Sequence, residues 1–108
     1  MNCIVTIPKT IKWKDYINEI NDAKDKNLSL YYRLPYKPKK LNIGDRFYIC
    51  HDGYIKGYMI VKNILFKDTF RCETTGKIWK KGYYIERKGE FYDIEYKPMK
   101  GFMGLRYL

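Results

Sequence analysis

The sequence predicts an α+β domain that is mainly β: a small, mostly antiparallel β-barrel of about six or seven strands, with one amphipathic helix after the first strand. Three observations support this class. Two β-rich runs, residues 46–51 and 54–65, flank Asp52-Gly53, a dipeptide suited to a tight hairpin turn. Both faces of that hairpin are substantially apolar, as expected in a barrel or a sandwich, or under a helix. Helical periodicity is confined to a single segment near the N-terminus.

Size and composition favour a single folded domain over residues 1–108. Hydrophobic residues make up 45% of the chain, with 12 Tyr and 5 Phe, so we expect a core rich in aromatic rings rather than a disordered chain. The chain holds 22 Lys and Arg against 12 Asp and Glu, a formal net charge of +10. A positive surplus of this size in a small domain favours a polyanionic partner.

The three cysteines, Cys3, Cys50 and Cys72, are an odd number without CxxC spacing. This pattern predicts neither a zinc site nor a complete disulfide framework, and it fits a reducing compartment. The ordinary role of such a thiol is that of a small buried hydrophobe. The sequence contains no recognisable signal peptide or membrane-spanning run. We therefore predict a soluble cytoplasmic protein without a metal or a cofactor.

The first strand is predicted at residues 2–7, which are rich in β-branched side chains and end before Pro8. A helix is predicted over residues 13–26, because apolar residues recur there at helical spacing. Thr10 is the expected N-cap and Asn27 the expected C-terminal residue. The opposite face of the helix carries charges of both signs and is predicted to be solvated. The apolar stripe expected to face the core consists of Trp13, Tyr16, Ile17, Ile20 and Ala23.

A second strand is predicted at residues 28–34, followed by an exposed, proline-stiffened basic loop over residues 35–40 and a turn at Gly44-Asp45. In the hairpin that comes next, a loop of Asp52 and Gly53 alone sets the cross-strand pairs His51 with Tyr54, Cys50 with Ile55, Tyr48 with Gly57 and Arg46 with Met59. One face would then carry Cys50, Ile55, Met59 and Val61, and the other Phe47, Ile49, Tyr58 and Ile60. The glycine in mid-strand, Gly57, predicts a bulge or a bend.

The remaining strands are predicted at residues 70–74, 83–87, 91–96 and 102–108. Turn signals separate them at Thr75-Gly76, at Lys88-Gly89 and at Pro98. Residues 77–82 are predicted to form a second basic loop, with Trp79 at its centre.

Lysines and arginines interleaved with aromatic residues predict a nucleic-acid-binding face. Single strands are held by cationic contacts to phosphate and by stacking of bases on aromatic rings, and both basic loops supply both residue types. The predicted contacts to nucleic acid are Arg33, Tyr36, Lys37, Lys39, Lys40, Lys77, Trp79, Lys80, Lys81, Lys97, Lys100 and Arg106, and Arg87 is a further candidate on the same basic face.

Structural alternatives stay open for several of these residues. The lysine clusters also fit an ordinary solvated surface, and Trp79 also fits a plug at one end of the barrel. The single histidine, His51, adjoins the hairpin turn without a paired Ser or Cys nucleophile, so we interpret it as a surface or turn residue rather than a catalytic base.

Three segments indicate a family resemblance: Ile43-Gly44-Asp45-Arg46-Phe47-Tyr48-Ile49, then Gly57-Tyr58-Met59-Ile60-Val61, and Gly101-Phe102 near the end. With the order strand, helix, strand and Gly-Asp-led hairpin, the chain resembles the PUA-like superfamily, in particular its bacterial ASCH and EVE branches. The resemblance implies a small β-barrel with a helix against it. It also implies a nucleic-acid or nucleotide-like ligand in a cleft beside that helix.

The leading prediction is a non-enzymatic module that binds RNA or single-stranded nucleic acid. A second class is an enzyme, because some small ASCH proteins are amidohydrolases that use a lysine, a threonine and a glutamate on an acylated cytidine. Lys9 or Lys12, Thr10 and Glu73 supply those residue types, but the Gly-x-Lys-x-x-Glu-x-Arg signature is absent near the helix. We therefore do not predict amidohydrolase activity for this chain from the resemblance. A third class is a protein-interaction module for an acidic partner.

Overall fold

The computed structural model of the protein describes residues 1–68, 70–71, 76 and 78–108. The elements in chain order are β1 (Cys3–Ile7), α1 (Trp13–Asp25), β2 (Leu30–Leu34), β3 (Arg46–His51), β4 (Tyr54–Lys67), β5 (Phe70–Arg71), β6 (Ile78–Trp79), β7 (Gly82–Arg87), β8 (Tyr92–Pro98) and β9 (Leu105–Tyr107). No helix in this described part of the chain has both the length and the hydropathy that a membrane span requires.

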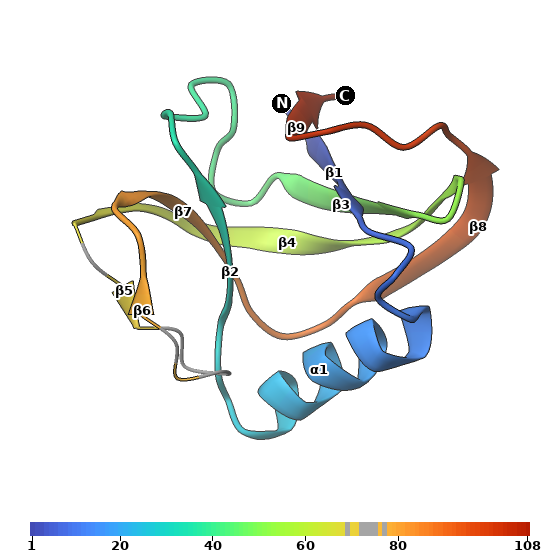
Figure 1. The fold of residues 1–108 in the computed structure, drawn as a ribbon, viewed down its shortest axis with the longest axis horizontal. Helices are drawn as coiled ribbons and strands as arrows, with labels where there is room; N and C mark the ends of the chain where they lie inside the picture. Colours follow the sequence, from blue (N-terminus) through green and yellow to red (C-terminus); the bar gives the residue numbers. More distant parts are fainter. Residues whose placement is uncertain (69, 72–75, 77) are drawn as a thin grey trace.

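Seven strands form one sheet, in the order β2-β7-β4-β3-β1-β9, with β8 also paired to β4. Among the described pairs only β1 with β3 is parallel. The long strand β4 organises the sheet, because it pairs with β3 and β8 near its start and with β7 near its end. Figure 1 shows the sheet curling into a half-barrel with α1 beneath it. The predicted fold class is confirmed: mainly β, mostly antiparallel, with one helix after the first strand.

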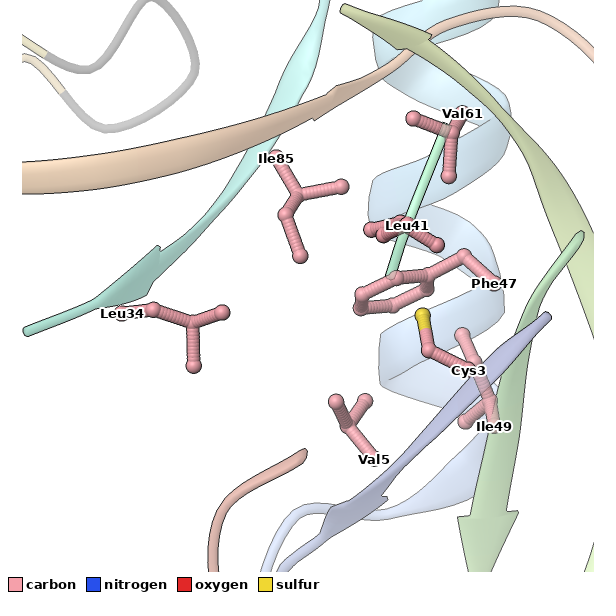
Figure 2. Close-up of a cluster of buried hydrophobic side chains, with 8 residues drawn as sticks. All are labelled: Cys3, Val5, Leu34, Leu41, Phe47, Ile49, Val61 and Ile85. Atoms are coloured by element: carbon pink, nitrogen blue, oxygen red, sulfur yellow. The ribbon is translucent and has the colours of Figure 1, made fainter. Parts of the chain in front are cut away.

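The core lies inside the curled sheet. Trp13 and Tyr16, on the predicted apolar stripe of α1, pack against its main cluster. Figure 2 shows the eight buried side chains of this cluster, which come from five strands and from the loop before β3: Cys3, Val5, Leu34, Leu41, Phe47, Ile49, Val61 and Ile85. In a second cluster the rest of α1 packs against β2 and β4; its buried residues are Ile20, Ala23, Leu30 and Met59.

The two ends of α1 differ from each other in how well the sequence predicted them. At the C-terminus, Asn27 adopts a left-handed φ of 58° and its N–H donates to the Lys24 carbonyl, which closes the helix as expected. At the N-terminus the prediction is wrong. Lys12 rather than Thr10 holds the N-cap position, and it makes no side-chain capping hydrogen bond. The apolar contacts of the helix therefore hold this end without a capping side chain.

The β3–β4 hairpin turns as predicted at Asp52 and Gly53, which have positive φ angles of 50° and 82°. The two predicted pairs next to the turn are confirmed, and the bulge expected at Gly57 is present. The Cys50–Ile55 pair is followed directly by Ile49 opposite Gly57, so Lys56 is the extra residue of the bulge.

Beyond the bulge the predicted register is wrong by one residue. Phe47 faces Met59, and Tyr48 faces Tyr58. Because side chains alternate between the faces of a strand, this shift exchanges the face on which each β4 residue lies. Met59 therefore points into the core with Phe47, whereas Tyr58 joins Tyr48 on the opposite face.

The region after β4 differs from the prediction in detail. Of the strand expected at residues 70–74, β5 covers the first two residues, and residues 72–74 lie outside the described part of the chain. The segment expected to be a basic loop, residues 77–82, contains the strand β6, which pairs with β5. Its turn-like composition hid this pairing, because a cross-strand partner is not visible in a local pattern. The last strand, β9, is shorter than predicted.

Candidate nucleic-acid interface

A row of directly paired residues crosses five strands on the face of the sheet opposite the core cluster, here called the outer face. From β9 to β8 the partners are Arg106, Ile4, Tyr48, Tyr58 and Tyr92. Direct partners share one face of a sheet, so these side chains lie next to one another. The last three form the tyrosine row, in which the Tyr58 ring is stacked on Tyr92 with centroids 5.1 Å apart and lies 5.2 Å from Tyr48.

Gly57 explains why β8 comes close enough to place Tyr92 beside Tyr58. A Cβ atom at this position would lie 2.4 Å from the Tyr92 carbonyl oxygen and 2.4 Å from the Phe91 ring. No side chain fits in that space, so only glycine permits the approach. The bulge and the glycine together build the tyrosine row.

Arg46 covers the centre of the tyrosine row. Its Cζ atom lies 4.4 Å from the centroid of the Tyr58 ring, and its Nη1 donates a 3.0 Å hydrogen bond to the Tyr48 hydroxyl. The hydrogen bond to Tyr48 raises the pKa of the Arg46 guanidinium, which stays charged. Arg46 is exposed, and Tyr92 keeps 44% of its surface in solvent. This arrangement presents a cation and aromatic rings on one accessible surface.

A hollow of about 450 Å³ adjoins Tyr48 and Arg46, between β8 and the strands β3 and β4. This volume is in the range of sites that hold a small molecule or a nucleobase. Arg46 and Lys97 place two positive charges on the walls, against one carboxylate from Glu95. The lining residues are Asn2, Arg46, Tyr48, Ile55, Ile94, Glu95, Lys97 and Leu108.

The second predicted basic loop contacts the end of β2, from which the first basic loop starts. Arg33, at the end of β2, donates from Nε and Nη2 to the Lys81 carbonyl at 3.1 and 2.7 Å. Gly82 makes room for this contact, since a Cβ there would lie 2.9 Å from Arg33 Nε. Beyond this contact the loops separate. Figure 1 shows the chain after β2 rising above the sheet and the β5–β6 pair on the other side.

The first loop runs from one end of the sheet to the other. Tyr36 is 51% exposed, and Lys37 and Lys39 are exposed. Lys40 reaches β9, where its backbone N–H donates to the Tyr107 hydroxyl at 3.3 Å. Since β2 and β9 are the two ends of the strand order, this loop bridges the opening of the half-barrel.

The second loop is described in part. Lys80 and Lys81 are exposed, and Lys81 Nζ lies 4.0 Å from Asp68 and 5.8 Å from the centroid of the Phe66 ring. Lys77 and the side chain of Trp79 lie outside the described residues.

The predicted residues of the C-terminal part lie near the outer face, with one exception. Lys97 lines the hollow, Lys100 is exposed, and Arg106 stands at the end of the paired row with its Cζ 4.3 Å from the Phe102 ring centroid. Arg87 is the exception. It is 4% exposed and lies in the interior, so the expectation that it extends a basic surface is wrong. Its position is inward because it alternates with Glu86 on β7 and shares the core face with Ile85.

Sequence reasoning missed a buried pair of basic side chains beneath α1. His51 is 5% exposed rather than a surface residue, and its Nε2 donates to the Ile11 carbonyl at 2.7 Å. Lys56 Nζ lies 3.1 Å from His51 Nδ1 and 4.9 Å from the Trp13 ring centroid. The bulge turns Lys56 inward, a common effect of an extra strand residue. In the sequence, the neighbouring Gly57 was the only indication of the bulge that buries Lys56.

The residue types of the amidohydrolase alternative do not form a site in the described structure. Lys9, Thr10 and Lys12 are exposed on the segment before α1, and Glu73 lies outside the described residues. Within the described residues, no group of three or more His, Cys, Asp and Glu side chains is placed to hold a metal ion.

Comparison of the chain with protein-family models, with curated proteins and with solved structures gives no match.

Proposed function

We propose that the protein binds single-stranded nucleic acid, with RNA preferred, on its outer face. The proposal rests on the tyrosine row and on Arg46 over its central ring. Aromatic rings on a sheet stack on nucleobases, and each stacked base contributes roughly 1–3 kcal/mol with little dependence on sequence. Tyr92, the outermost ring of the tyrosine row, keeps 44% of its surface in solvent and is therefore accessible to a base.

Positive charge around the tyrosine row supports the same function. Arg46 and Lys97 flank the hollow, and Arg106 ends the paired row on the side of β9. Phosphate groups of a strand stacked on the tyrosines would contact these side chains. The formal net charge of +10 and the exposed lysines of the first loop add a longer-range attraction for a polyanion.

Single strands are favoured over duplexes because bases within a duplex are stacked on one another and cannot reach the rings. The preference for RNA rests on the resemblance to the PUA-like superfamily, and membership of that superfamily is part of the proposal. In this proposal the hollow beside Tyr48 and Arg46 receives one unstacked base, and the tyrosine row holds its neighbours.

The decisive test compares two exposed tyrosines by fluorescence anisotropy with a labelled ten-nucleotide RNA. Tyr92→Ala removes the outermost ring of the tyrosine row and is expected to weaken binding by about fivefold or more, the lower bound for one stacked base. Tyr54→Ala is the matched control, since Tyr54 is 45% exposed, close to the 44% of Tyr92, and lies outside the row. Equal affinities for the two variants would refute the outer face as the binding surface.

The cationic contribution has its own test in the dependence of affinity on salt. The logarithm of the binding constant is expected to fall linearly with the logarithm of salt concentration, with a slope of about −0.7 for each phosphate contact on a single strand. Arg46→Gln should reduce that slope by roughly one contact. A change of Lys37, Lys39 and Lys40 to Gln together reports whether the first loop also contacts the strand. An affinity that does not change with salt would refute an electrostatic contact to phosphate.

A further inference from the structure

The interior of the half-barrel contains an arginine that has no ion-pair partner among the described residues. Arg87 is the last residue of β7, where its backbone lies between Leu30 of β2 and Val61 of β4, both of which are core residues. Its side chain is 4% exposed, and its Cζ lies 4.4 Å from the centroid of the Phe47 ring. Among the described residues, no carboxylate forms a salt bridge with Arg87.

Two hydrogen-bonding atoms of this guanidinium are unsatisfied. Arg87 Nε and Nη1 are buried and have no hydrogen-bond partner among the described residues, and the same is true of the Tyr16 hydroxyl. The two side chains are close to each other. Burial raises the pKa of Tyr16, and both the positive charge of Arg87 and a hydrogen-bonding interaction with its side chain oppose that rise. The charge of Arg87 also opposes the burial-induced rise in the pKa of Tyr32 and of Cys3, so it acts on all three groups.

Such an arrangement is costly unless something compensates the charge. An arginine does not lose its proton in proteins, and a buried charge without a partner is strongly destabilising. More than nine in ten buried polar groups of native proteins have a partner, so each exception requires an explanation. Nε–H and the Nη1 hydrogens leave the guanidinium on opposite edges, so one oxyanion can accept from one of these edges and from the neighbouring Tyr16 O–H.

We propose that Arg87 and Tyr16 form a binding site for a small oxyanion, a carboxylate or a phosphate group, between α1 and the core face of the sheet. Arg87 supplies the charge and one N–H donor, and Tyr16 supplies the hydroxyl donor. Tyr16 and Tyr32 are partly exposed and mark the side from which the anion enters. This site is separate from the proposed nucleic-acid interface, because Phe47 and Tyr48 point to opposite faces of β3.

The test uses inorganic phosphate and acetate as probes, with ionic strength held constant by sodium chloride. In protein labelled with ¹⁵N, the Nε–Hε resonance of Arg87, assigned by its loss in Arg87→Met, is expected to move on titration with at least one probe. The same probe should raise the melting temperature of the wild type. Arg87→Met should weaken binding by about 30-fold or more, the effect of truncating one partner of a buried charge contact. Tyr16→Phe keeps the ring, removes the donor and should weaken binding by a smaller factor.

Lys62→Met is the matched control, since it removes one exposed positive charge from β4. It should bind both probes as the wild type does. An Arg87 resonance that moves with neither probe would overturn the proposal, and so would thermal stabilisation that persists in Arg87→Met. If Arg87→Met does not fold, the rise in melting temperature of the wild type with either probe, and its reduction in Tyr16→Phe, decide. Loss of RNA binding in the Tyr92 variant leaves this outcome unaffected, so the two proposals fail separately.

Discussion

Two arginines stack on aromatic rings on opposite faces of the same sheet, at the same separation. On the outer face Arg46 Cζ lies 4.4 Å from the Tyr58 ring, and in the interior Arg87 Cζ lies 4.4 Å from the Phe47 ring. Water solvates the charge of Arg46, whereas Arg87 is 4% exposed. The contact therefore requires little desolvation of the guanidinium on the outer face and nearly complete desolvation in the interior. Burial, rather than the geometry of the stack, decides what each guanidinium does.

The two faces come from alternating residues of the same strands. Phe47 and Tyr48 are neighbours in β3, and each pairs with a β4 residue on its own face, Met59 and Tyr58. The bulge at Lys56 sets the register that pairs Phe47 with Met59 and Tyr48 with Tyr58. The substitutions and measurements below test one face or both, from the largest expected effect to the smallest.

The largest effect is expected for Gly57→Ala, because the glycine supports both faces. The new Cβ would lie 2.4 Å from the backbone oxygen of Tyr92, so β8 must move away from β4. We expect a loss of about 3 kcal/mol in the free energy of unfolding, measured by urea denaturation. Gly101→Ala is the control, since its Cβ would meet only a Thr6 methyl group at 3.3 Å. Equal losses in both variants would show that β8 does not need the close approach.

The comparison of the two arginines predicts stability changes of different size. Arg87→Met removes a buried charge that has no ion-pair partner in the described part of the chain and keeps most of the apolar volume, so the free energy of unfolding is expected to rise by about 1–4 kcal/mol in buffer without phosphate or carboxylate anions. Arg46→Met should leave stability nearly unchanged, because its charge is solvated. Urea denaturation of both variants and the wild type measures this. A loss of stability in Arg87→Met would show that the guanidinium has a structural partner.

The buried thiol of Cys3 is expected to make the free energy of unfolding depend on pH. Burial raises the pKa of Cys3 from 9.0 to about 12. Above pH 9 the unfolded chain releases this proton while the native state keeps it, so the native state is disfavoured as pH rises towards 12. At pH 10 the loss from this group is about 1.4 kcal/mol relative to pH 8. The difference in unfolding free energy between wild type and Cys3→Ala should therefore narrow or reverse between these pH values. If the difference in unfolding free energy between the two proteins stayed constant from pH 8 to pH 10, the raised pKa of Cys3 would be contradicted.

The rates of alkylation of Cys3 and Cys50 compare a thiol in the interior with one on the other face of the sheet. Burial also raises the pKa of Cys50, and its Sγ contacts the Met99 carbonyl at 3.6 Å beneath the segment that leads to β9. With iodoacetamide at pH 8, followed by peptide mapping, both thiols should react far more slowly than in urea. Cys50 should react before Cys3, because only a surface segment covers it. The reverse order would mean that the interior opens more easily than the outer face.

The smallest effect is expected at the turn that starts β3. The Asn42 backbone N–H donates to Asp45 at 2.7 Å and lowers the pKa of that carboxyl below 3.8. The contribution of this contact is complete above that value and disappears as pH falls through the native pKa. Asp45→Asn should thus be slightly less stable than the wild type at pH 7, and equal to it at pH 2, by urea denaturation. An equal difference at both pH values would exclude the ionised carboxylate as its cause.

Much of the fold was predictable because its signals are local. The positive φ angles of Asp52 and Gly53, the left-handed Asn27 and the apolar stripe of α1 depend on residues close together in sequence. The candidate site was less predictable. The lysines of the two loops are a visible pattern, but the tyrosine row joins residues of β3, β4 and β8, and no local pattern shows which tyrosines become neighbours.

The sequence by itself determined the fold class, the hairpin turn, the position of the bulge and the excess of positive charge. Only the tertiary structure decided that Tyr58 is paired with Tyr48 and that Arg87 and Lys56 are buried. The physical reason is that one extra residue in a strand reverses the faces of all residues after it, while burial of a charge depends on what distant segments place around it.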